Sequence, residues 1–222
     1  MIDQDPTLTI GDFQITVVVN SPPWFQNCYV VRHGPTGEQF VIDPGGEADR
    51  IAAVVVAGGG ALKEILLTHG HPDHLGAVRA LQDRFGVPCL AHGDERATIE
   101  ALPTWARAMM QMRIDLPSDC RYFTNEPKFS HGTYAVQAFQ CPGHTPGGIC
   151  LLFDGFAFIG DTLFNQGVGR TDLPGGDSDQ LVGSITRLLG LLDDKVVLFS
   201  GHGPEWTAGA ARSWWRYAQR MF

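Results

Sequence analysis

The stretch Thr68-His69-Gly70-His71-Pro72-Asp73-His74 decides how this sequence of 222 residues is interpreted. It brings three imidazoles and a carboxylate together, and both groups are common ligands of divalent metals. The apolar run Ile65-Leu66-Leu67 before it predicts a strand, and residues 73–85 have the apolar spacing of a helix. A ligand-bearing loop between a strand and a helix is typical of functional sites in α/β proteins. The alternative interpretation of residues 68–74 is a surface turn rich in histidine that binds no metal.

Three further candidate ligands follow strand-like runs later in the chain, each beside a glycine. His144 follows Gly143, Asp161 follows Gly160, and His202 lies between Gly201 and Gly203. Glycine permits tight turns and a close approach of the backbone, which side chains directed at a shared metal require. Each residue alone is compatible with an ordinary loop position, but together with the first cluster they predict a metal site.

The order of these blocks resembles the metallo-β-lactamase superfamily. Residues 142–147 and 160–172 resemble more closely its glyoxalase II-like branch, the hydroxyacylglutathione hydrolases. The resemblance extends from about Asn27 to Gly203. It implies an α/β fold, an αββα sandwich of two mixed β-sheets flanked by helices. The length of 222 residues is enough for one large domain, so a single domain over residues 1–222 is expected. Several β-lactamase subclasses have Cys or Ser where this chain has Asp161, so those subclasses are disfavoured.

The resemblance also implies two divalent metal ions. The implied ligands are His69, His71 and His144 for the first metal, Asp73, His74 and His202 for the second, and Asp161 as the bridging carboxylate. The ligand types favour zinc and are also compatible with iron or manganese.

The reaction that this site implies is hydrolysis of a thioester, with S-D-lactoylglutathione as the model substrate. Two close divalent metals can supply hydroxide at neutral pH, so no serine or cysteine nucleophile is required. Asp73 and Asp161 are the predicted catalytic residues, and Asp73 is also expected to hold the proton released during attack. Two alternatives remain open, a persulfide dioxygenase with one iron and a lactonase. Gly203-Pro204 after His202 disfavours the dioxygenase branch, which tends to have Asp after this histidine.

Loop residues near these motifs are the candidates for substrate binding. They are Trp24, Asn27, Phe164, Arg170 and Trp206. Arg170 can bind a carboxylate of a glutathione-like substrate or form a structural ion pair with Asp172 or Asp177. Trp24 and Trp206 are either walls of a pocket or packing residues. The tail after His202 is short, so the chain resembles compact bacterial members that lack the C-terminal helical domain of full-length glyoxalase II.

The composition of the chain limits the kinds of partner that it can bind. The formal net charge of −8 argues against nucleic-acid binding. The sequence contains no run of about 20 apolar residues, so no membrane span is predicted. A small-molecule thioester is the expected partner. Residues 1–6 are polar and acidic, unlike a signal peptide, so a cytoplasmic location is expected, where the five cysteines would be reduced. The aromatic residues 214–222 either pack on the body of the protein or form the contact of a homo-oligomer.

Overall fold

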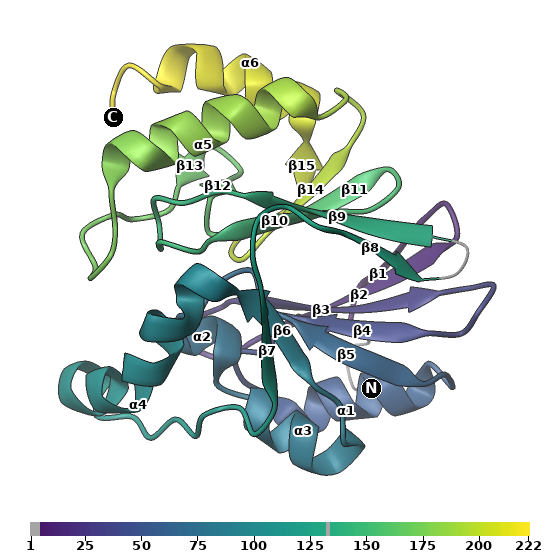
Figure 1. Cartoon of the computed structure of the whole chain (residues 1–222). Helices are drawn as coiled ribbons and strands as arrows, with labels where there is room; N and C mark the ends of the chain where they lie inside the picture. The colour runs from purple at the N-terminus through teal and green to yellow at the C-terminus, as the bar shows by residue number, and fades with distance from the viewer. Residues whose placement is uncertain (1–4, 132–133) are drawn as a thin grey trace. The chain divides into compact units, whose positions relative to one another are not determined.

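A computed structural model describes residues 5–131 and 134–222 and divides the chain into two compact units (Figure 1). The first unit extends to Ala91 and includes Arg96–Tyr122, and the second consists of His92–Glu95 and Phe123–Phe222. Each unit contains one mixed β-sheet with helices packed on it. The predicted fold class, two mixed β-sheets flanked by helices, is confirmed. The single domain over residues 1–222 stays a prediction.

The first unit contains a seven-stranded sheet in which the strands lie in chain order. The strands are β1 (Thr7–Ile10), β2 (Phe13–Val19), β3 (Asn27–His33), β4 (Gln39–Ile42), β5 (Leu62–Leu66), β6 (Cys89–His92) and β7 (Cys120–Phe123). The strands from β1 to β4 pair antiparallel, whereas β5 pairs parallel with both β4 and β6. The carboxyl ends of β4 and β5 therefore meet at one edge of the sheet, where the loops that follow both strands lie together.

Parallel neighbours need crossover connections, which helices usually supply. α1 (Ala48–Ala57) connects β4 to β5, and α2 (Pro72–Leu75) and α3 (Val78–Phe85) connect β5 to β6. α4 (Arg96–Met110) completes this unit, preceded by the short 3₁₀ helix η1 (Gly93–Glu95). α1 and α3 contact each other, and α1 also contacts β2 and β3.

The single helix expected over residues 73–85 is wrong, because the chain forms two helices that are interrupted at Gly76 and Ala77. The backbone N–H of Ala77 donates to the carbonyl of Pro44 at 2.8 Å instead of continuing the first helix. A Cβ atom on Gly76 would lie 2.4 Å from the carbonyl oxygen of Gly45. The loop after β4 therefore packs directly on α2, and this contact breaks the helical pattern.

The second unit contains a six-stranded sheet in the order β15-β14-β11-β10-β9-β8 and a small sheet of β12 and β13. The strands are β8 (Lys128–His131), β9 (Tyr134–Gln140), β10 (Ile149–Leu152), β11 (Phe156–Gly160), β12 (Leu163–Phe164), β13 (Gly167–Val168), β14 (Val197–Ser200) and β15 (Trp206–Thr207). β11 and β14 are parallel, with Gly160 opposite Ser200. The loops that begin at Asp161 and Gly201 therefore start side by side.

Helices α5 (Ser178–Leu191) and α6 (Ala208–Ala218) pack against this sheet (Figure 1). Each helix begins at a side-chain cap, a common way of satisfying the free N–H groups of the first turn. The Asp177 carboxylate accepts from the N–H of Gln180 at 2.9 Å, and the Thr207 hydroxyl accepts from the N–H of Ala210 at 3.2 Å. The apolar spacing of residues 177–191 predicts a helix from residue 177, and the observed helix starts one residue later, with Asp177 as its cap.

The apolar face of α5 provides a direct test of packing. Leu188 is 1% exposed in the core of the second unit, whereas Leu191 in the same helix is 54% exposed. Leu188→Ala is expected to lower the free energy of unfolding by about 2–5 kcal/mol, because it leaves a cavity. Leu191→Ala is the matched control, with an expected change within about 0.5 kcal/mol. Chemical denaturation followed by circular dichroism measures both, and equal losses would contradict the orientation of α5.

The cysteines agree with the sequence analysis where the structure tests it. All five are free. Cys28, Cys89 and Cys150 lie in apolar, strand-like runs of the sequence, which predicts core positions, and all three are buried. Over residues 5–131 and 134–222, no helix has the length and apolar character needed to cross a bilayer. Residues 1–4, on which the expectation of a cytoplasmic location partly depends, lie outside the described residues, and that location stays a prediction.

Candidate metal centre

The histidine-rich loop lies between β5 and α2 at the carboxyl edge of the first sheet. His71 is the residue before α2, and Pro72 occupies the first helical position, where its missing N–H costs nothing. His69, His71 and His74 are all buried, with exposed fractions of 2%, 8% and 0%. The imidazole ring centroids of His69 and His74 lie 4.0 Å apart. Buried imidazoles packed this closely are typical of a ligand set rather than a surface turn, which excludes the alternative of a solvated histidine-rich loop.

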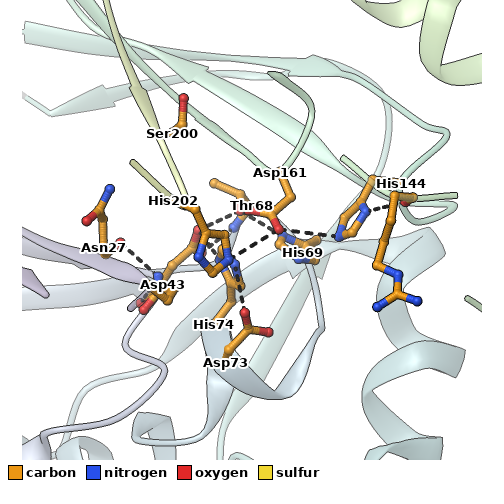
Figure 2. Close-up of polar contacts among 12 residues, drawn as sticks. Asn27, Asp43, Thr68, His69, Asp73, His74, His144, Asp161, Ser200 and His202 are labelled. Carbon is orange, nitrogen blue, oxygen red and sulfur yellow. Dashed lines mark hydrogen bonds and ion pairs between the residues drawn. The ribbon is translucent and has the colours of Figure 1, made fainter. Parts of the chain in front are cut away.

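Asp43, directly after β4, fixes this loop in place (Figure 2). Its carboxylate accepts from the N–H of Thr68 at 2.7 Å and from the hydroxyl of Thr68 at 2.5 Å. The Nδ1 atom of His74 lies 2.9 Å from the same carboxylate. Since a carboxylate only accepts, Nδ1 carries the proton and Nε2 is left with a lone pair for a metal. Asp43, His69 and His74 each offer a ligand atom within 4.8 Å of the other two.

Asp43 is a candidate site residue that the sequence analysis missed, because the sequence Asp43-Pro44-Gly45-Gly46 by itself predicts only a turn. Its backbone has a φ of 50°, in the left-handed region, where non-glycine residues are uncommon and tend to occur at functional sites. A Cβ atom on Gly45 would lie 1.4 Å from the carbonyl oxygen of Asp73. The signal available in the sequence is an acidic residue directly after a strand, followed by a proline and two glycines.

Asp73 and His71 are the other two predicted ligands in the first unit. The Oδ2 atom of Asp73 lies 3.8 Å from Nε2 of His74, and the Asp73 side chain is 13% exposed. The indole of Trp105 in α4 is stacked on the ring of His71, with centroids 6.4 Å apart and planes inclined by 18°. All four predicted ligands from this loop are therefore buried or nearly buried at one end of the sheet.

The second unit brings its three predicted ligands together. Asp161 follows β11, and its Oδ2 atom lies 3.7 Å from Nε2 of His144 and 3.5 Å from Nε2 of His202 (Figure 2). These distances are too long for hydrogen bonds. Two ligands bound to one zinc at about 2.1 Å in tetrahedral geometry lie roughly 3.4 Å apart. The spacing of the three side chains therefore fits a carboxylate shared between metals that each histidine would bind.

A backbone carbonyl on the side of the ring away from Asp161 fixes the orientation of His144. Its Nδ1 atom lies 2.7 Å from the backbone carbonyl of Arg170, so Nδ1 donates and Nε2 is the atom available to a metal. Gly143 has a φ of 131°, and a Cβ atom there would lie 2.3 Å from the backbone nitrogen of Leu181. Only glycine fits at this position, which explains the glycine before His144.

Gly169 provides a test of this packing. A Cβ atom on Gly169 would lie 1.9 Å from the carbonyl oxygen of Asp161 and 3.1 Å from Cγ of His144. Gly169→Ala is therefore expected to displace both ligands and to weaken metal affinity at least about ten-fold. Gly183→Ala, on α5 with open space around it, is the control. Competition with a chromogenic chelator measures the metal affinity of both variants. Equal affinities in the two variants would contradict this account.

The five predicted substrate-binding residues lie in different surroundings. Arg170 forms a two-point ion pair with Asp172, at 2.6 and 2.7 Å, which is the structural alternative that the sequence left open. The ring of Phe164 is perpendicular to that of His202, 5.8 Å away. Trp206 is 9% exposed and packs in the core of the second unit next to Trp214. Trp24 is half-buried, and Asn27 is buried at the start of β3.

Comparison with known proteins agrees with this geometry. The family model of the metallo-β-lactamase superfamily matches residues 21–202. The hydroxyacylglutathione hydrolase GloC of Haemophilus influenzae is 36% identical over 188 residues, which cover 83% of this chain and 88% of that protein. This chain belongs to the metallo-β-lactamase superfamily, a family of hydrolases.

Two solved structures extend the comparison. The BLEG-1 B3 metallo-β-lactamase has a TM-score of 0.81 at 33% identity, covering 90% of this chain and 96% of its own. The protein TTHA1623 in a di-iron-bound form has a TM-score of 0.77, also at 33% identity, covering 88% of this chain and 96% of its own. The His and Asp clusters thus lie in a fold of metal-binding hydrolases.

Proposed function

We propose that this chain is a metal-dependent thioester hydrolase of the glyoxalase II-like type, acting on S-D-lactoylglutathione or a related acyl thioester. The observation that carries the metal-dependent part is the Asp161 carboxylate, with one oxygen at 3.5 and 3.7 Å from two imidazole nitrogens. The 36% identity to a hydroxyacylglutathione hydrolase supports the choice of substrate.

The donor set fits two divalent ions. We propose that His69, His71 and His144 hold one ion and that Asp73, His74 and His202 hold the other, with Asp161 shared between them. The imidazoles suit zinc, and the di-iron form of a neighbour at 33% identity makes iron the alternative. When bound, such ions lower the pKa of water towards neutrality and polarise a carbonyl group.

The chain's own residues then have separate tasks. Asp43 holds His74 and the carbonyl of Arg170 holds His144, so that these two imidazoles are fixed before substrate arrives. Asp161, beside His144 and His202, is the shared carboxylate. Asp73 is the residue proposed to accept the proton released during attack, and its carboxylate near His74, 13% exposed, supports this role. Phe164, perpendicular to His202, limits the approach of the substrate from that side.

A thiol nucleophile is not supported by the structure. Cys141 lies near His144 in the sequence, and it is 1% exposed within the core of the second unit. Burial raises the pKa of its thiol to about 12, so it is protonated at neutral pH and unreactive. Hydrolysis without a covalent intermediate on the chain is therefore the proposed route.

A β-lactam hydrolase is the second candidate, because the BLEG-1 B3 enzyme is 33% identical with a TM-score of 0.81. The two functions are separated by kcat/KM values for S-D-lactoylglutathione and for a chromogenic cephalosporin, measured on the same metal-loaded protein. We expect the thioester to be preferred. Preference for the cephalosporin would replace the proposal with the second candidate, and oxygen uptake with glutathione persulfide would replace it with the dioxygenase alternative.

A further inference from the structure

Cys89 and Cys120 form a pair of thiols in the first unit that the hydrolase site does not use. Cys89 is in β6 and Cys120 is in β7, the neighbouring strand at the edge of the seven-stranded sheet. The backbone N–H of Cys89 donates to the carbonyl of Asp119, the residue before Cys120, at 2.9 Å. Both side chains belong to the apolar cluster of the first unit, with Cys89 in its buried part and Cys120 packed against it. Their side chains therefore lie on the same face of two adjacent strands.

The two thiols differ in access to solvent. Cys89 is fully buried within the core of the first unit, whereas Cys120 is partly exposed and packs at the margin of that core. A small oxidant can therefore reach Cys120 but not Cys89. This asymmetry is the arrangement expected of a reactive thiol with a second thiol held behind it.

The surroundings of Cys120 favour its thiolate form. The hydrogen bond from Cys89, assisted by Tyr122 and by the positive charge of Arg96, lowers the pKa of the Cys120 thiol to about 7, against the opposing effect of burial. Arg96 lies over the ring of Tyr122 with its Cζ atom 4.0 Å from the ring centroid. The pKa of Cys89 is raised, by the same hydrogen bond and by burial. Cys120 is therefore the nucleophile of the pair, since the thiolate is the reactive form.

We propose that Cys120 and Cys89 are a peroxide-sensitive modification site that closes to a disulfide between β6 and β7. In the first step the Cys120 thiolate attacks a hydroperoxide: an S–O bond forms, the O–O bond breaks, and hydroxide or alkoxide leaves. Cys120 becomes a sulfenic acid and the peroxide is reduced. In the second step the Cys89 sulfur attacks Cys120: an S–S bond forms, the S–O bond breaks, and water leaves with the proton of Cys89.

The backbone geometry is compatible with this product. Neighbouring strands lie about 4.8 Å apart, and disulfides are found at Cα separations of roughly 4.4–6.8 Å. The pair sits on two strands that are already hydrogen-bonded. Closure therefore requires little movement of the sheet.

The test treats the full chain with hydrogen peroxide, quenches with an alkylating reagent and measures the intact mass and the cross-linked peptides. We expect the loss of two hydrogen atoms per chain and a peptide that joins Cys89 to Cys120. Cys150→Ala is the control and should keep this product, because Cys150 is buried in the other unit. A disulfide between other cysteines, or no disulfide when Cys120 is oxidised, would overturn the proposal.

Two variants separate the steps. Cys89→Ala should stop at the sulfenic acid, which dimedone traps on Cys120, and Cys120→Ser should give neither product. In the unmodified chain, the rate of alkylation of Cys120 by iodoacetamide should rise with pH to a midpoint below the ordinary cysteine value of about 8.5, because its pKa is lowered. A midpoint at or above that value would contradict the role of the pair.

Arg96→Gln should slow that alkylation at pH 7 by about two-fold, because removing a nearby positive charge raises the pKa of a thiol by roughly half a unit and so about halves the thiolate fraction at this pH. Arg107→Gln, also exposed on α4, is the matched control and should leave the rate unchanged. Equal rates in the two variants would show that Arg96 does not assist the thiolate.

Discussion

Asp161→Ala is expected to lower kcat/KM for S-D-lactoylglutathione by about 10³-fold or more and to release metal from the protein. Asp161 is 9% exposed and has its carboxylate oxygen beside two histidines. Metal ions in such sites contribute several kcal/mol to the transition state, and about 4 kcal/mol corresponds to 10³-fold in rate. Steady-state kinetics and metal analysis of the purified variant measure both effects.

Asp154→Ala is the matched control for this variant. Asp154 is exposed in the turn between β10 and β11, at the opposite end of the strand that leads to Asp161. Its replacement should leave activity and metal content unchanged. An Asp161→Ala variant that kept both properties would remove Asp161 from the metal centre and with it the central argument for the site.

Asp43→Ala should weaken metal affinity by about 10–100-fold, the usual effect of removing a residue that orients a metal-binding histidine. The same change leaves the N–H of Thr68 and Nδ1 of His74 without their buried acceptor. Each such group costs about 1–3 kcal/mol, so the metal-free protein should be destabilised by about 3 kcal/mol. Chelator competition and chemical denaturation give the two quantities.

Asp49→Ala is the control, because Asp49 is a fully exposed carboxylate on α1. Asp43→Asn should fall between the two. Asparagine tolerates the left-handed backbone at this position and keeps one acceptor for the N–H of Thr68, but it loses the negative charge. If Asp43→Ala bound metal as tightly as Asp49→Ala, the hydrogen bonds of Asp43 would be structural only.

The elements with clear apolar patterns were predicted from the sequence with their bounds. The apolar patterns of residues 13–19 and 39–42 predict strands and that of residues 48–57 predicts a helix, and β2, β4 and α1 have these bounds. Several strands were missed, including β1 and β7 at the two edges of the first sheet. Their residues are all exposed or only partly buried, so they carry too little apolar signal to predict a strand. The two-residue strands β12, β13 and β15 are too short for any periodicity.

The candidate ligands were predictable because each follows an apolar strand and lies next to a glycine or within the histidine-rich loop. Asp43 was not, since its role depends on the parallel pairing of β4 with β5, which brings Asp43 to Thr68 across the sheet edge. The ion pair of Arg170 with Asp172 is one of the two roles that the sequence allows for Arg170. The sequence alone does not show which partner Arg170 has, because a carboxylate of the substrate and the carboxylate of Asp172 can bind the same guanidinium group.

The most direct test of the central claim is a titration of the metal-free protein with zinc, in which bound metal and hydrolysis of S-D-lactoylglutathione are followed together. The proposed ligand set predicts two bound ions per chain, with activity that reaches its maximum only as the second ion binds. Saturation of both signals at one ion per chain, or full metal loading without thioester hydrolysis, would contradict the account of this protein as a two-metal thioester hydrolase.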